Sequence, residues 1–105
     1  MANLQKLSQL RKQVERIDKA ILKKLGERFS VTSEIQELKK TLKMPATQSK
    51  REKELLDAYL ELGKELGVPK LLISRFYTEI FSFAKKYGNM KRWNYRKTSK
   101  KVKSQ

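Results

Sequence analysis

The chain has 105 residues, no cysteine, no histidine and a formal net charge of +15 at pH 7. These absences exclude disulfides, thiolate chemistry, the commonest general base and the commonest metal ligand. The length suits one small domain, no apolar run approaches the roughly 20 residues of a membrane span, and the first residues do not resemble a signal peptide. We therefore expect a soluble, cytoplasmic protein that does not bind a metal.

The positive charge is concentrated near the end of the chain. Residues up to Glu79 carry 17 Lys and Arg against 11 Asp and Glu, whereas nine basic residues and no acidic residue follow. Residues 89–105 have no apolar period, so we expect a largely disordered basic tail. Trp93 and Tyr95 alternate there with basic residues, which leaves nucleic-acid binding open beside a merely solubilising role. The charge predicts an anionic partner, either a small polyanion, a nucleic acid or an acidic surface.

The longest regular pattern runs from Leu4 to Lys43. It contains no proline and one glycine, and its apolar residues recur at steps of three and four, as in one continuous amphipathic helix. At about 1.5 Å per residue it would span roughly 60 Å, whereas a compact chain of this size has a radius of gyration of about 13 Å. A lone chain would leave the apolar stripe in water. We therefore expect an obligate helical oligomer, most simply a homodimer.

Two shorter helices follow the long one. Pro45 ends the first helix, because the residue before a proline disfavours the α region. The segment Ser49-Lys50-Arg51-Glu52 has the S-x-x-E form of a capping box, which predicts a second helix ending just before Gly67. Pro69 suits the first turn of a third helix that ends near Gly88. No strand pattern occurs, so the predicted fold is all-α, with one very long and two shorter helices per chain.

Three basic residues of the long helix are candidates for a binding site. Arg28 and Lys39 lie about three turns apart, within roughly 20° on one face, so both can reach one small ligand. Arg28 falls on the apolar stripe, where a charge needs an anion from a partner or a ligand. Arg11 is about 25 Å from Arg28 along the helix and reaches the same site only from an antiparallel partner. Otherwise, Arg11 is a residue at the rim of the apolar seam.

The remaining polar candidates have simple structural explanations. Glu52 is explained by the capping box, and Arg51 by a solvated surface position. The sequence offers no Ser-His-Asp set, no cysteine nucleophile and no glycine loop for phosphate. If the protein is an enzyme, it works by positioning and electrostatics.

The chain resembles the all-helical, type II class of chorismate mutases over about residues 4–88. The resemblance is carried by Leu10-Arg11, Ile17-Asp18, Glu27-Arg28, Ile35, Lys39, Pro45, Arg51-Glu52 and Ile73-Ser74-Arg75-Phe76. It implies an intertwined dimer of three-helix chains that rearranges chorismate to prephenate, a step of aromatic amino-acid biosynthesis in the shikimate pathway. This Claisen rearrangement needs no cofactor. Residues 1–88 would form the mutase domain, and the basic tail lies outside it.

The resemblance also implies roles for individual residues. Arg28 and Arg11 of the partner subunit would each bind a carboxylate of chorismate. Lys39 would donate to the ether oxygen, on which charge develops in the transition state. Glu52 would accept a hydrogen bond from the ring hydroxyl, and Arg51 would assist nearby.

Three positions depart from the pattern of the family. Gln48 stands where an aspartate is usual, and its amide can still bond a hydroxyl. Ala84 replaces a serine near one carboxylate, and Gly88 replaces the second donor to the ether oxygen. Loss of such a donor costs about 10²–10³ in rate. Either the activity is low, or it has been lost, or a neighbour compensates, the candidates being Lys85, Lys86 and Tyr87.

Two alternatives to a chorismate mutase remain open at this stage. The related helical isochorismate-pyruvate lyases use a similar basic pocket. A catalytically weak domain of this fold would instead serve as a regulatory or binding module.

Overall fold

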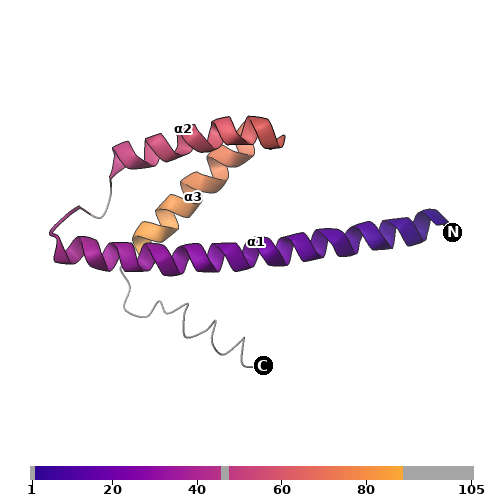
Figure 1. Ribbon diagram of the computed structural model, residues 1–105, viewed down its shortest axis with the longest axis horizontal. Coiled ribbons are helices and arrows are strands. Elements are labelled where there is room, and N and C mark those ends of the chain that lie inside the picture. Colours follow the sequence, from indigo (N-terminus) through magenta and orange to yellow (C-terminus); the bar gives the residue numbers. More distant parts are fainter. Residues whose placement is uncertain (1, 46–47, 89–105) are drawn as a thin grey trace, which may run out of the picture.

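The computed structural model describes residues 2–45 and 48–88, which form three α-helices and their connections (Figure 1). The helices are α1 (Ala2–Thr41), α2 (Ser49–Leu66) and α3 (Lys70–Gly88). No strand occurs among these residues, which confirms the all-α prediction. None of the described helices has the length and apolarity needed to cross a bilayer. The predicted disordered tail, residues 89–105, lies outside the described residues.

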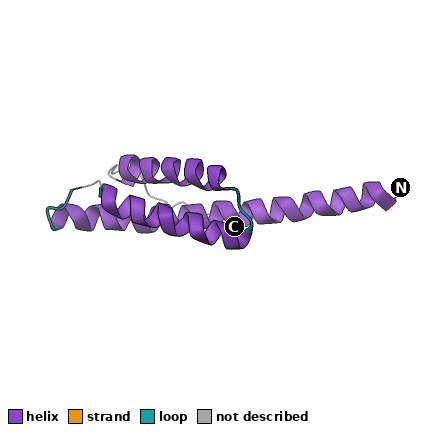
Figure 2. Cartoon of the chain, turned by 90° about the horizontal axis from the view of Figure 1, so that it is seen from above, coloured by secondary structure: helices purple, strands orange, loops and turns teal. Residues whose placement is uncertain are grey.

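Helix α1 is one unbroken rod, as the periodicity predicted. It is 40 residues long, and α2 and α3 lie beside its C-terminal half only (Figures 1 and 2). Every side chain from residue 3 to residue 24 is exposed. The radius of gyration is 17.6 Å, against about 13 Å for a compact chain of this length. The chain therefore leaves half of its longest helix without cover.

Apolar side chains line that uncovered half. The exposed fractions of Leu4, Val14 and Ile17 are 70%, 56% and 59%. Leu7, Leu10 and Ile21 continue the same stripe and are also exposed. A stripe of this length is costly to leave in water, since each buried aliphatic side chain contributes about 1.5–3 kcal/mol.

Helix α3 carries the small core and separates the other two helices. It contacts both α1 and α2, whereas α1 and α2 do not contact each other. The buried apolar residues are Ile73, Ile80, Phe81 and Ala84, all on α3. Gly63 of α2 is buried against α3, and a Cβ there would collide with Cδ1 of Ile73. The glycine thus permits the close approach of α2 to α3.

The start of α2 differs from the predicted capping box. Gln48 occupies the N-cap with no side-chain cap hydrogen bond, and its carbonyl accepts from the amide of Glu52 at 3.1 Å. Ser49 is therefore the first helical residue and not the cap, so the capping-box prediction is wrong. The physical reason is tertiary: the Glu52 carboxylate is paired with a lysine of α3 instead of with the helix start.

The end of α2 follows the prediction. Gly67 has φ 72°, in the left-handed region, and its amide bonds back to the last turn of α2. The amide of Val68 donates to the carbonyl of Gly63 at 2.9 Å, which completes the helix stop and directs the chain into α3.

Gly67→Ala should lower the free energy of unfolding by about 1 kcal/mol, because a Cβ disfavours the left-handed conformation. No atom would clash with that Cβ, so the loss measures the backbone alone. Urea unfolding at a fixed protein concentration measures the change. Gly67→Asn is the matched control and should lose less, since asparagine tolerates this conformation. An alanine variant as stable as the wild type would contradict the assignment.

Candidate active site

Arg28 of α1 lies in an environment that favours the binding of an anion. Its side chain is half-buried, and Nη1 is buried without a hydrogen-bond partner in the structure. Its guanidinium carbon lies 5.6 Å from the centroid of the Phe81 ring of α3. The ring supplies a cation–π contact, but it cannot accept the Nη1 hydrogens in the way an anion does. A buried donor left unpaired is unfavourable, so the position suits a bound carboxylate.

Glu52 and Lys85 form an ion pair between α2 and α3. Nζ of Lys85 lies 3.1 Å from Oε2 and 3.4 Å from Oε1 of Glu52. The two side chains are 28% and 30% exposed, respectively. The Glu52 carboxylate thus turns toward α3 at the first turn of α2 and stays free of the helix start. This orientation leaves it able to accept a hydrogen bond from a neutral hydroxyl.

The other predicted site residues lie on the same three helices. Lys39 is half-buried near the end of α1, Gln48 is the half-buried N-cap of α2, and Arg51 beside it is exposed. Ala84 is buried, and Gly88 is the last residue of α3. Arg28 contacts Phe81 of α3, and Glu52 contacts Lys85 of α3. Helix α3 therefore connects Arg28 of α1 with Glu52 in the first turn of α2.

Arg11 is not part of this cluster within one chain. It is exposed on the uncovered half of α1, about 25 Å along the helix from Arg28. The structure thus agrees with the expectation that Arg11 of the same chain cannot reach the site.

A large open cavity adjoins Arg28. It has a volume of about 840 Å³ and is bordered by all three helices. Lys24 and Arg28 are the charged residues of its wall; most of the others are aliphatic or aromatic, among them Ile17, Ile21, Leu62, Leu66, Leu72 and Phe76. Such walls suit another apolar surface better than a doubly charged small molecule.

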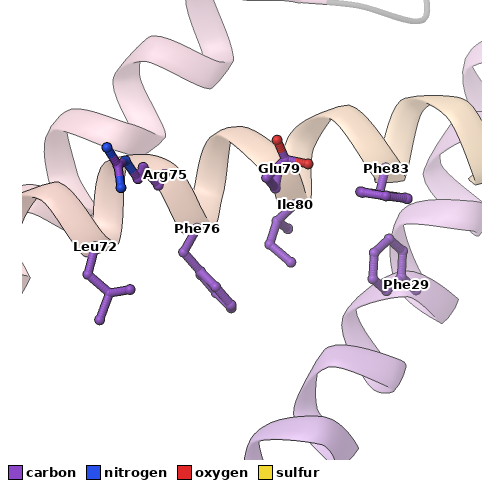
Figure 3. Close-up of a pocket in the computed structure, with 7 residues that line it drawn as sticks. All are labelled: Phe29, Leu72, Arg75, Phe76, Glu79, Ile80 and Phe83. Atoms are coloured by element: carbon purple, nitrogen blue, oxygen red, sulfur yellow. The ribbon is translucent and has the colours of Figure 1, made fainter.

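A second apolar groove, which we call the α3 groove, lies along α3. Phe29, Leu72, Phe76, Ile80 and Phe83 line it, with Arg75 and Glu79 at its edge and a volume of about 680 Å³. Figure 3 shows Leu72, Phe76 and Ile80 projecting from one side of α3, while Phe83 faces Phe29 of α1. Leu72 and Phe83 are 57% and 43% exposed.

Two features of the site were not evident in the sequence. Arg28 and Phe81 lie on the apolar faces of two different helices, and no local sequence pattern indicates that they are in contact. Lys85 was one of three candidate compensating residues, and its contact with Glu52 distinguishes it. Lys86 is exposed, and the side chain of Tyr87 lies outside the described residues. The described residues contain no group of three or more acidic or other metal-ligating side chains placed to hold a metal ion.

Comparison with known proteins identifies relatives of this chain. A bifunctional chorismate mutase/prephenate dehydratase of Aquifex aeolicus is 37% identical over 82 residues, which cover 75% of this chain and 23% of that protein. A chorismate mutase of Methanocaldococcus jannaschii is 37% identical over 65 residues, covering 62% of this chain and 66% of that protein. The chain thus spans about a quarter of the first relative and about two thirds of the second. No solved structure matches the chain.

A family model also matches the chain. The model described as chorismate mutase type II matches residues 10–89, which include Arg11, Arg28, Lys39, Glu52 and Lys85. The match runs through most of α1 and the whole of α2 and α3. The chain belongs to the chorismate mutase type II family.

Proposed function

We propose that this protein is a chorismate mutase that converts chorismate to prephenate in the cytoplasm, with residues 1–88 as the catalytic domain. The observation that carries the proposal is the buried, unpaired Nη1 of Arg28 in a chain of this family. Both relatives are named for chorismate mutase activity. A dicarboxylate substrate supplies the anion that this guanidinium lacks.

The rearrangement of chorismate requires only that the protein position the substrate and place charged groups around it. In the rearrangement, the C–O bond of the enol ether breaks while a C–C bond forms, and the electrons move within the substrate. No proton is transferred and no covalent intermediate with the protein forms. Catalysis therefore comes from holding the substrate in its reactive conformation and from stabilising the charge that develops on the ether oxygen.

The proposed residue roles follow from this requirement. Arg28 binds one carboxylate in a bidentate geometry, and Lys39 donates to the ether oxygen. The Glu52 carboxylate accepts a hydrogen bond from the ring hydroxyl, which its orientation away from the helix start supports. Gln48 and Arg51, at the start of α2, border the same region and assist in binding the hydroxyl side of the ring.

We propose further that the site is completed in a homodimer of intertwined chains. Two exposed apolar surfaces support this: the stripe on the first half of α1 and the α3 groove with its adjoining cavity. A second copy offers each surface the other as a partner. An antiparallel arrangement of two α1 helices brings Arg11 of the partner subunit toward Arg28, where it binds the second carboxylate.

Purified protein should consume chorismate and form prephenate, followed by the loss of chorismate absorbance and by chromatography of products. Arg28→Ala should lower kcat/KM by at least about 10²-fold, because a charge-assisted contact with the substrate is lost. Arg16→Ala removes an exposed arginine from the same helix and should leave the rate unchanged. No turnover of chorismate, or turnover only of isochorismate to salicylate and pyruvate, would contradict the proposal.

Val14→Glu should convert the dimer to a monomer, because a charge on the apolar stripe opposes its burial. Sedimentation equilibrium should give twice the 12.4 kDa chain mass for the wild type and the single mass for the variant. Gln13→Glu adds the same charge at the adjacent position off the stripe and should remain dimeric. A wild-type protein that sediments as a monomer would refute the dimer.

Subunit mixing tests whether Arg11 acts across the dimer. Arg11→Ala and Arg28→Ala should each be nearly inactive alone. After unfolding and refolding together in equal amounts, half of the dimers are mixed, and each mixed dimer holds one intact site. The mixture should recover about one quarter of wild-type activity. Activity equal to the average of the two parents would show that the two arginines do not meet across subunits.

A further inference from the structure

We propose that Lys85 is the second donor to the ether oxygen, taking the place of the side chain that Gly88 lacks. The inference rests on the proposed function and names a residue that the pattern of the family does not supply. On this proposal, the glycine at position 88 does not mean that a donor is missing, because Lys85 supplies the donor instead. Three features of α2 and α3 carry it.

The first feature is where the Lys85 ammonium lies. Its Nζ contacts both oxygens of Glu52, at 3.1 and 3.4 Å, across 33 residues of sequence. The pair is only 28–30% exposed, whereas the side chains of the local pairs Lys24–Glu27 and Lys64–Glu61 are 47–81% exposed. A long lysine side chain is thus held in a partly desolvated position that a solvated surface lysine does not adopt.

The second feature is the room around Lys85. Side chains on a helix tilt toward its N-terminus, so a side chain at position 88 would cover the turn that contains residues 84 and 85. Glycine at position 88 has no side chain to cover this turn, and Ala84 contributes only a methyl group. Both departures from the family pattern therefore remove bulk beside Lys85.

The third feature is the alignment with Arg28. Lys85 follows Phe81 by four residues, so both lie on one face of α3, about 6 Å apart along the helix. The guanidinium of Arg28 lies over the ring of Phe81. One face of α3 therefore contacts the guanidinium of Arg28 through Phe81 and holds the ammonium of Lys85 beside Glu52.

Substrate chemistry makes the position next to Glu52 the relevant one. The ring hydroxyl and the ether oxygen of chorismate are on neighbouring ring carbons, so a group beside the hydroxyl acceptor lies beside the ether oxygen too. The lysine ammonium has three donors and no acceptor. The pairing holds the ammonium beside Glu52, from where it can turn a donor toward the ether oxygen as its charge develops. A cationic donor is stronger there than a neutral amide.

The test compares variants at positions 85, 86 and 88 in steady-state turnover of chorismate. Lys85→Met keeps the length of the side chain and removes every donor, so kcat should fall by about 10²-fold or more. Lys85→Arg retains a cationic donor and should keep kcat within about tenfold of the wild type. Lys86→Met is the matched control on the exposed neighbour and should behave like the wild type.

A double variant separates a donor role from a merely structural one. Adding Gly88→Gln to Lys85→Met restores a donor from the neighbouring turn without restoring the ion pair with Glu52. It should recover at least about tenfold in kcat over Lys85→Met alone. Gly88→Gln in the wild type is the control: it should raise kcat much less there than in Lys85→Met, because Lys85 already donates to the ether oxygen. An equal gain in both backgrounds, as expected if Lys85 only anchors Glu52 or joins α2 to α3, or no gain in Lys85→Met, overturns the inference.

The remaining outcomes are equally decisive. A Lys85→Met variant with unchanged kcat, or with a raised KM alone, overturns the inference while the mutase assignment stands. Circular dichroism and sedimentation establish that each variant is a folded dimer; if Lys85→Met is not, Lys85→Ala with and without Gly88→Gln is judged by the same criteria. Wild-type protein without turnover overturns the proposed function, and this inference with it.

Discussion

The uncovered apolar stripe on α1 is the constraint on which the rest of the molecule depends. A helix of 40 residues cannot be covered by two helices of 18 and 19 residues that lie beside only one of its halves. The core that one chain builds is correspondingly small and confined to α3. The proposed dimer would cover this stripe, and the same association would deliver Arg11 of the partner subunit to the site. In the proposed dimer, stability and assembly of the site would depend on the same contacts between subunits.

The site itself is an arrangement of charges that the chain only partly compensates. Arg28 has a ring beneath it and a buried nitrogen without an acceptor. Glu52 has a lysine beside it and no role at its own helix start. A protein that optimised only its own stability would pair such groups internally, because unpaired buried donors are unfavourable. The unpaired Nη1 of Arg28 instead favours a bound anion, such as a carboxylate of the proposed substrate.

The sequence predicted what local rules determine. Apolar periodicity and the stops at Pro45 and Gly67 place all three helices within a few residues of their observed bounds. The failures have tertiary causes. The capping box was a sound local hypothesis, but Glu52 is paired with Lys85, which lies 33 residues away and carries no local mark. The burial of Arg28 was expected from its place on the stripe, whereas its Phe81 contact depends on how α3 crosses α1. The roles assigned to Arg11, Lys39 and Gln48 rest on family resemblance and remain predictions.

A reaction without covalent catalysis sets loose demands on residue identity and strict demands on charge position. A nucleophile or a metal ligand has to be a particular type of residue at a particular position, because a neighbouring residue of another type cannot do the same chemistry. A hydrogen-bond donor to a developing oxyanion can come from any element that reaches the same point with the right charge. The last two turns of α3 illustrate this freedom. Small residues at 84 and 88 flank a lysine that is already paired with Glu52 of α2. If Lys85 has the role proposed above, a donor lost at position 88 has been replaced by one at position 85.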